Sequence, residues 1–255
     1  MLVTGAASGI GAASALRLAQ EGAQVVGADV APASGAWGEV LRAAPAARLA
    51  RVDVREEAQV ERFVADAFAA HGRIDGVMNA AGVAGGGPVH LLSLEEWNRV
   101  LAVNLTGSFL VCKHAVARML ERRSGSIVNV ASIEGLEGAE GGSAYNASKG
   151  GVVLLTRNMA MDYGRRGIRV NCICPGLIDT PMSRSIFPEA GMAGPRRHFV
   201  EAHQLGRPGR AEEVAAAAAF LLSDDASFVS GHALPVDGGL LAGHRYGVAE
   251  LMGLA

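Results

Sequence analysis

Apolar segments alternate with amphipathic segments along the whole of this sequence. The short apolar runs predict β-strands at residues 1–3, 24–29, 49–54, 74–79, 126–131, 168–174 and 233–236. The longer stretches predict helices from Gly11 to near Gly22 and at residues 36–44, 57–70, 94–120, 144–164 and 211–222. Strands that alternate with helices in this way predict a Rossmann-type, doubly wound α/β fold. It would have one parallel sheet of about seven strands, with helices on both faces.

No break in composition divides residues 1–255, so we expect a single domain that both binds a dinucleotide and carries the chemistry. Ligands of such sheets bind beyond the carboxyl ends of the strands. Six candidate site residues fall at predicted strand ends: Gly5, Asp29, Asp53, Asn79, Ser132 and Pro175. Residues 181–207 are rich in Pro, Gly and Arg and are expected to form an irregular or helical lid over the substrate. In that lid, Ile186 and Phe187 would exclude water from the reacting carbon.

Composition argues against several classes of protein. The 255 residues carry a formal net charge of -2 without an acidic or basic block, so neither nucleic acid nor a membrane surface is an expected partner. Three cysteines do not suggest a disulfide framework, and the seven histidines lack the spacing of metal ligands, so we expect no metal. No apolar run reaches the length of a transmembrane helix, and no signal peptide opens the chain. We therefore expect a cytoplasmic protein.

The turn after the first strand has the glycine spacing of a dinucleotide-binding unit. Gly5 would allow the tight turn, Gly9 would let a pyrophosphate approach the backbone, and Gly11 would let the helix pack close to the sheet. Asp29 ends the next strand, where a carboxylate binds the ribose hydroxyls and repels a 2′-phosphate. The neighbouring turn residues are not basic, and no arginine is expected there. The cofactor is therefore predicted to be NAD rather than NADP.

A second motif indicates proton transfer. Tyr145 and Lys149 are four residues apart, so on a helix they stand on the same face. A phenol has a pKa of about 10, and a neighbouring ammonium is expected to lower it. Ser132 would hold the oxygen of the substrate. Together the three side chains predict a site that interconverts an alcohol and a ketone, provided that another part of the chain binds an electron carrier.

With these motifs the sequence resembles the classical short-chain dehydrogenase/reductase family over essentially its whole length. The motifs are Thr4-Gly5-x-x-x-Gly9-Ile10-Gly11, Asp53-Val54, Asn79-Ala80-Ala81-Gly82, Asn104, Ser132, Tyr145-x-x-x-Lys149 and Pro175-Gly176. Ala80 departs mildly from the family's usual asparagine pair. The family also usually has several residues before its first strand. A truncated or alternatively started chain, with a short or frayed first strand, is therefore an open interpretation.

The resemblance implies a role for each motif. Catalysis would fall to Ser132, Tyr145, Lys149 and Asn104, with Asn104 binding a water that links Lys149 to solvent. The implied cofactor contacts are Gly5, Ser8, Gly9, Ile10, Gly11, Asp29, Asp53, Val54, Asn79, Ala80, Ala81, Gly82, Tyr145, Lys149, Pro175, Gly176, Ile178 and Thr180. Within this set, Asp53 would bind the adenine amino group. Residues 79–82 would pack on the adenine ribose and steady the central strand, and Thr180 would hold the carboxamide.

The resemblance also implies an assembly. The helix at 144–164 is apolar all round at residues 152–155, which indicates burial on more than one side. Family members typically pair this helix across a four-helix interface, so we expect a homotetramer.

Three functions compete at this point. The first is an NAD-dependent dehydrogenase or ketone reductase acting on a partly hydrophobic small molecule, such as a steroid, a cyclic diol, a sugar or a hydroxyketone. The second is an NADPH-dependent 3-oxoacyl-[acyl-carrier-protein] reductase, which Asp29 disfavours and the lid arginines weakly favour. The third, a non-catalytic nucleotide sensor, is disfavoured because both Tyr145 and Lys149 are present. Glu134 either faces the substrate or is a solvated loop acid, and His203 is expected to be an exposed lid residue.

Overall fold

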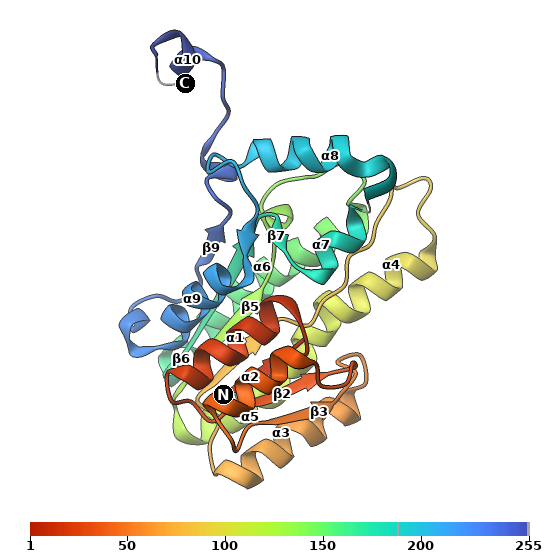
Figure 1. Ribbon diagram of the computed structural model, residues 1–255. Coiled ribbons are helices and arrows are strands. Elements are labelled where there is room, and N and C mark those ends of the chain that lie inside the picture. The colour runs from red at the N-terminus through yellow and green to blue at the C-terminus, as the bar shows by residue number, and fades with distance from the viewer. Residues whose placement is uncertain (188, 254–255) are drawn as a thin grey trace.

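A computed structural model describes residues 1–187 and 189–253. Its main sheet contains β1 (Leu2–Thr4), β2 (Val26–Asp29), β3 (Arg48–Arg51), β4 (Gly76–Asn79), β5 (Gly125–Val130), β6 (Ile168–Pro175) and β9 (Ala233–Val236). These seven strands are parallel and lie in the order β3-β2-β1-β4-β5-β6-β9 (Figure 1). The order reverses between β1 and β4, and such a reversal opens a crevice for a ligand.

Helices cover both faces of the sheet because the strand residues alternate between two apolar clusters. Met78 and Val128 face a cluster with α1 (Gly9–Gln20), α2 (Gly35–Ala43) and α9 (Ala211–Leu222). Val77 and Ile127 face the opposite cluster, with α3 (Glu57–His71), α5 (Gly107–Arg122) and α6 (Ser143–Tyr163). Side chains that alternate along a strand and are buried on both sides are typical of a parallel sheet between helical layers. The predicted Rossmann-type α/β fold is confirmed.

The first strand is short but well held. Leu2 pairs with Val26 of β2 on one side and with Val77 of β4 on the other. The amino group of Met1 donates to the carbonyl of Gln24 at 2.7 Å. The strand is therefore paired along both edges rather than frayed.

Two predicted strands end earlier in the structure than expected. β3 ends at Arg51, two residues before Asp53, whose N–H donates to Gln59 Oε1 at 3.0 Å instead of to a strand carbonyl. β5 ends at Val130, two residues before Ser132, whose hydroxyl accepts from the N–H of Glu134 at 3.2 Å. In both places a local turn replaces the last ladder bonds. The two side chains still lie at the carboxyl edge of the sheet.

The predicted helix at 94–120 forms as α4 (Leu94–Leu101), a π-helical turn (Ala102–Thr106) and α5. Ser93 caps it by accepting from the N–H of Glu96 at 3.1 Å, but the Glu96 carboxylate binds Arg99 instead of closing a capping box. The continuous stretch Leu94–Arg122 contains a window of mean hydropathy 1.5, long and apolar enough to cross a membrane. The expectation that no apolar run reaches the length of a transmembrane helix is therefore corrected. Half of that window is buried in the protein, so this is a core helix.

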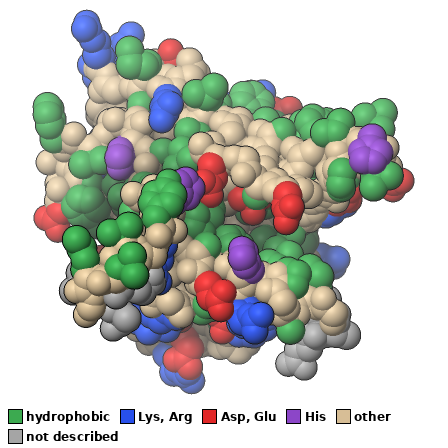
Figure 2. All heavy atoms as spheres, turned by 90° about the horizontal axis from the view of Figure 1, so that it is seen from above, with side chains coloured by type: hydrophobic (Ala, Val, Ile, Leu, Met, Phe, Trp, Pro, Cys, Tyr) green, Lys and Arg blue, Asp and Glu red, His purple; other side chains and the backbone are tan. Residues whose placement is uncertain are grey.

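Residues beyond β6 build the predicted lid. β7 (Ile178–Asp179) pairs with β8 (Gly209–Arg210), and between them lie α7 (Pro181–Ile186) and α8 (Glu189–Ala202). Figure 1 shows α8 above the sheet and the C-terminal segment with α10 (Val248–Leu251) extending from the body. Figure 2 looks down on this end, where the surface is hollowed and lined by hydrophobic, acidic and histidine side chains. In the part of the lid that the structure describes, α7 and α8 are helical and residues 203–207 are irregular.

Candidate active site

The structure brings Ser132, Tyr145 and Lys149 together where β5 ends and α6 begins. Tyr145 and Lys149 lie in the first two turns of α6, on one face as their spacing predicts. Lys149 Nζ is 5.6 Å from the centre of the Tyr145 ring and donates to the carbonyl of Val130 at 2.8 Å. The carbonyl at the end of β5 therefore fixes the ammonium beside the phenol.

Burial dominates the acid–base properties of this group. It raises the pKa of Tyr145 to about 12, with the Glu134 carboxylate as a second cause, while a hydrogen bond to Ser132 acts in the opposite direction. Burial also lowers the pKa of Lys149 to about 8. The expectation that the ammonium lowers the pKa of Tyr145 below its ordinary value is therefore wrong. Removing both groups from water disfavours their charged forms more than proximity favours them.

Asn104 lies at the centre of the π-helical turn and is completely buried. Its amide accepts from the N–H of Val83 at 2.8 Å, and it donates to the carbonyl of Val83 at 3.0 Å and to Ser148 Oγ at 3.1 Å. A Cβ on Gly82 would lie 3.3 Å from Asn104 Oδ1 and 3.6 Å from Lys149 Nζ. Asn104 thus lies next to Lys149, and its amide joins the pocket wall to α6. Its role in a water relay stays a prediction.

Ser148 joins this cluster although no sequence motif pointed to it. It is fully buried, accepts from Asn104 and donates to the carbonyl of Tyr145 at 2.7 Å. It therefore connects the π-helical turn to the backbone of the catalytic tyrosine. The available signal was its place between Tyr145 and Lys149, within one helical turn of each.

A row of buried polar side chains crosses the sheet beneath the site. Thr4 Oγ1 donates to Asn79 Oδ1 at 3.2 Å, Asn79 donates to Asn129 at 3.1 Å, and Asn129 donates to Thr156 of α6 at 3.0 Å. Thr4 Oγ1 also accepts from the N–H groups of Ala80 and Ala81. Asn79 and its turn therefore steady the central strands, as predicted. Asn129 and Thr156 were not foreseen.

The glycine turn has the shape that a pyrophosphate requires. Gly5 has a φ of 66°, in the left-handed region, and a Cβ there would lie 2.7 Å from the carbonyl oxygen of Ala80. A Cβ on Gly11 would collide with the Gly5 carbonyl, so the helix packs against the turn only because that side chain is absent. The N–H of Ala12 makes the first bond of α1, to Ser8, at 3.1 Å. The N–H groups of residues 9–11 thus precede the helical ladder and suit an anion.

Asp29 orders the turn beside the predicted ribose site. Its carboxylate accepts from the N–H of Ala7 and from the N–H of Ala31, both at 2.9 Å. Its register partner on β3 is Arg51. The pairing of β2 with β3 sets the backbone of Arg51 next to that of Asp29. That no arginine is placed to receive a 2′-phosphate stays a prediction. The carboxylate itself still lies at the end of β2.

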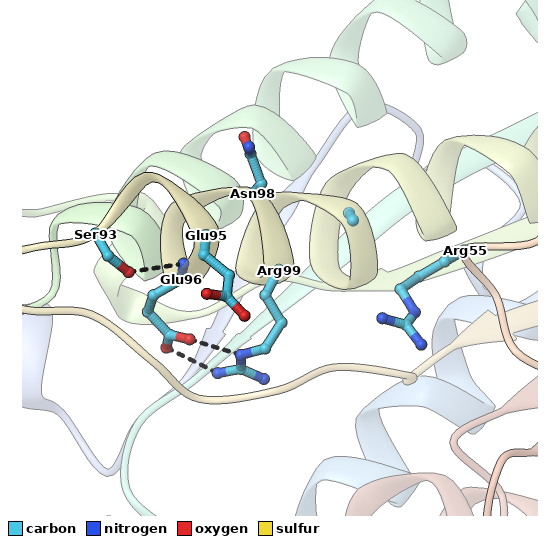
Figure 3. Close-up of a pocket in the computed structure, with 7 residues that line it drawn as sticks. Arg55, Ser93, Glu95, Glu96, Asn98 and Arg99 are labelled. Carbon is cyan, nitrogen blue, oxygen red and sulfur yellow. Dashed lines mark hydrogen bonds and ion pairs between the residues drawn. The ribbon is translucent and has the colours of Figure 1, made fainter.

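Asp53 forms an ion pair with a neighbouring arginine. Arg55 Nη2 contacts Asp53 Oδ2 at 2.6 Å, and hydrogen bonding from Arg55 holds the pKa of Asp53 below its ordinary value. Arg55 also lines a hollow of about 620 Å³ with Ser93, Glu95, Glu96, Asn98, Arg99 and Ala102 (Figure 3). This hollow is not the catalytic pocket, since Ser132, Tyr145 and Lys149 do not line it. It lies beside the residue predicted to bind adenine.

The segment after β6 folds back toward the glycine turn. Pro175 pairs with Val236, and Thr180 caps α7 while its methyl group lies 3.4 Å from where a Cβ on Gly9 would be. Thr180 thus reaches the predicted phosphate site from the opposite side. The implied contacts of Gly176 and Ile178 with the carboxamide stay predictions.

His203 corrects another expectation. It is 2% exposed rather than an exposed lid residue. Its Nε2 accepts from the N–H of Leu177 at 3.0 Å, and its Nδ1 lies 2.7 Å from the carbonyl of Phe199. Phe199 in turn packs against Phe187 with the two rings tilted and their centres 6.0 Å apart. Phe187 therefore serves to connect α7 with α8. The lid charges do behave as expected, since Arg184 pairs with Asp179 at 3.0 Å and both are largely exposed.

The apolar centre of α6 is only partly covered in the single chain. Val152 and Val153 are buried, but Leu154 is 63% exposed and Met161 is 83% exposed. Burial on a second side therefore requires a further molecule, and the homotetramer stays a prediction.

Comparisons with known proteins identify the family of this chain. A family profile described as "Enoyl-(Acyl carrier protein) reductase" matches residues 5–241. The chain is 42% identical to levodione reductase of Leifsonia aquatica, over 96% of this chain and 94% of that protein. It is 46% identical to cis-4-hydroxycyclohexanecarboxylate dehydrogenase of Sinomonas cyclohexanicum, over 94% and 96%. It is 41% identical to meso-2,3-butanediol dehydrogenase of Serratia marcescens, over 95% and 94%.

The structural comparison points the same way. The crystal structure of levodione reductase superposes with a TM-score of 0.91 at 42% identity, covering 95% of this chain and 97% of that one. The fold, the motifs and the relatives together lead to one family. The chain belongs to the short-chain dehydrogenase/reductase family, and it is an oxidoreductase that acts on alcohols and ketones.

Proposed function

We propose that this protein is an NAD-dependent dehydrogenase that interconverts a small, uncharged secondary alcohol and its ketone. The observation that carries the choice of cofactor is Asp29, whose carboxylate ends β2 where the adenine ribose of a dinucleotide would lie. Asp29 would accept hydrogen bonds from the ribose hydroxyls and repel a 2′-phosphate. Three relatives are named for levodione, cis-4-hydroxycyclohexanecarboxylate and meso-2,3-butanediol, and these names support a small substrate.

The chain itself supplies binding and proton control. The N–H groups of residues 9–11 would hold the pyrophosphate, and Lys149 would hold the nicotinamide ribose. A bound nicotinamide supplies the hydride acceptor or donor. Ser132 and Tyr145 hold the substrate oxygen, and Tyr145 takes the alcohol proton during oxidation and returns it during reduction. Because the pKa of Lys149 is lowered to about 8, its ammonium can exchange protons near neutral pH.

A second candidate is an NADPH-dependent 3-oxoacyl-[acyl-carrier-protein] reductase. The observation in its favour is Arg51, the register partner of Asp29, since a guanidinium there could pair with a 2′-phosphate. We favour the first candidate because the Asp29 carboxylate lies at the same edge. A cytoplasmic homotetramer, with the exposed Leu154 side of α6 covered by a second copy, completes the proposal.

Steady-state kinetics with NAD and NADP separate these candidates. The substrates are cyclohexanol, cyclohexane-1,2-diol, butane-2,3-diol and a 3-oxoacyl thioester. Tyr145→Phe tests the predicted catalytic tyrosine, and Tyr246→Phe, at an exposed tyrosine, is its matched control. We expect turnover of the alcohols with NAD, loss of at least about 100-fold in kcat in Tyr145→Phe, and unchanged NAD affinity. A strong preference for NADP with the thioester would instead establish the second candidate, and normal activity of Tyr145→Phe would refute the mechanism.

A further inference from the structure

Glu134 faces Tyr145, the predicted catalytic tyrosine. It lies in a 3-10 turn (Ile133–Gly135) directly after Ser132, and its N–H donates to Ser132 Oγ at 3.2 Å. Its charge is close enough to Tyr145 to raise the pKa of the phenol. Among the described residues, no hydrogen-bond donor or cation contacts its carboxylate. Of the two interpretations of Glu134, the structure therefore favours the one in which it faces the substrate.

A second unpaired acceptor lies beside it. Asn146, the residue after Tyr145, donates through Nδ2 to the carbonyl of Ala139 at 3.1 Å, which fixes the orientation of its amide. Its Oδ1 is buried and accepts no hydrogen bond. A Cβ on Gly142 would lie 2.9 Å from Glu134 Oε2 and even closer to Asn146 Oδ1. The two oxygens therefore converge on one spot next to Gly142.

Of these two converging acceptors, Asn146 Oδ1 is buried without a donor and Glu134 is half-buried. A buried polar atom without a hydrogen bond destabilises the folded protein, and most such atoms have a partner. Glu134 and Asn146 cannot supply a donor to each other while the Glu134 carboxyl is ionised. A hydroxyl of a ligand would satisfy the carboxylate, whereas a carboxylate, phosphate or sulfonate at this position would be repelled.

We infer that Glu134, with Asn146 and Gly142 beside it, forms a subsite for a second hydroxyl group of the substrate. This inference rests on the proposed function and narrows its substrate class to uncharged diols and hydroxyketones. The reacting oxygen binds between Ser132 and Tyr145. The second hydroxyl lies on a nearby carbon and donates its proton to the Glu134 carboxylate in a hydrogen bond. The bond is charge-assisted, so it discriminates strongly between a diol and the matching mono-alcohol.

The test compares two matched substrates in four forms of the full chain. Cyclohexane-1,2-diol and cyclohexanol differ by one hydroxyl, and their kcat/KM values with NAD are measured for the unchanged protein, Glu134→Gln, Gly142→Ala and Glu137→Gln. Glu137 is an exposed acid three residues away and serves as the control. We expect the unchanged protein and Glu137→Gln to share the same preference for the diol. Glu134→Gln should reduce that preference at least about 10-fold. Gly142→Ala, which puts a methyl group between the two oxygens, should reduce it as well.

The ratio of the two kcat/KM values removes any effect of Glu134 on Tyr145, because both substrates share that step. The same ratio in the unchanged protein and in Glu134→Gln would overturn the subsite. Saturation-transfer NMR measures the binding of the two compounds to the NAD-saturated protein, and this readout does not need turnover. Diol-selective binding that Glu134→Gln abolishes supports the subsite even if neither compound is oxidised, a result that would count only against the proposed function. Equal binding of both compounds would overturn the subsite.

Discussion

Lys149 lies with its ammonium 5.6 Å from the centre of the Tyr145 ring, and the carbonyl of Val130 holds it there at 2.8 Å. Lys149 is only 4% exposed, so this placement keeps a charge in the core of the protein. Such a charge is costly unless it is fully paired. The single carbonyl only partly compensates, which is why the pKa of Lys149 falls to about 8. The catalytic arrangement therefore reduces the stability of the ligand-free protein.

Lys149→Met should make the ligand-free protein more stable at pH 7 while abolishing activity. The folded pKa of Lys149 is about 8 and its ordinary value is 10.5, so the unfolded chain binds this proton more tightly. The contribution of Lys149 to the free energy of unfolding is therefore greatest above pH 10.5, and it is lost as the pH falls from 10.5 to about 8. Methionine carries no charge and avoids this penalty. We therefore expect the free energy of unfolding at pH 7 to rise by about 2 kcal/mol, a value that includes the lost hydrogen bond to Val130.

Urea unfolding at pH 7 and pH 10 measures this gain. The advantage of Lys149→Met over the unchanged chain should narrow as the pH rises from 8 to 10.5. Lys113→Met, at a half-exposed lysine, should show no comparable change with pH. A variant that is less stable than the unchanged chain at both pH values would show that the buried charge is well compensated.

The sequence predicted contacts between residues that are close along the chain, and it missed contacts between residues that are far apart. Tyr145 and Lys149 could be placed together because one helical turn separates them, and the glycine turn because it is local to one strand–helix junction. Arg51 was overlooked because only the register of β2 against β3 sets it beside Asp29. Burial also escaped prediction, and with it the direction of the pKa shift of Tyr145. A side chain's exposure depends on every element that packs around it.

The polar row beneath the site shows the same limit. Thr4, Asn79 and Asn129 belong to strands that neighbour each other only in the order β1-β4-β5, which alternating apolar runs do not specify. Asn79 was predicted through its motif, whereas Asn129 carried no motif and looked like an ordinary strand residue. Long-range pairing of strands thus supplied what local pattern could not.

Glu134→Gln should shift the pH dependence of alcohol oxidation toward lower pH. The Glu134 carboxylate raises the pKa of Tyr145, so removing its charge lowers the pH at which the phenol becomes a base. The rising limb of kcat/KM against pH should therefore move down when cyclohexanol, which lacks a second hydroxyl, is the substrate. Glu137→Gln is the control. An unmoved limb would show that the charge of Glu134 does not act on Tyr145 once NAD is bound.

Asp29→Asn should relax the preference for NAD. The change removes the charge that repels a 2′-phosphate but keeps one oxygen to accept from the N–H of Ala7 or Ala31. Arg51, its register partner, then becomes the dominant charge at this edge. We expect the ratio of kcat/KM for NAD over NADP to fall by at least about 10-fold, which corresponds to about 1.4 kcal/mol.

Asp29→Asn combined with Arg51→Ala separates the two charges. If Arg51 attracts the 2′-phosphate, the double variant should use NADP less well than Asp29→Asn alone while its use of NAD changes little. Equal use of NADP by both variants would limit the effect to loss of the carboxylate. An unchanged ratio in Asp29→Asn would remove the argument for NAD altogether.

His203 is expected to position the segment that reaches the nicotinamide. Its Nε2 accepts from the N–H of Leu177, next to Gly176, where a Cβ would lie only 2.6 Å from the same nitrogen. His203→Leu leaves that buried N–H without an acceptor, which should cost about 1–3 kcal/mol of stability. The KM for NAD should rise more than kcat falls, because the contact lies away from Ser132 and Tyr145.

His203→Gln can supply an acceptor oxygen, so it should restore part of both losses. His198→Leu, in the exposed part of α8, is the control. If His203→Leu lost stability but bound NAD normally, and His203→Gln rescued nothing, His203 would be a packing residue with no influence on the cofactor segment.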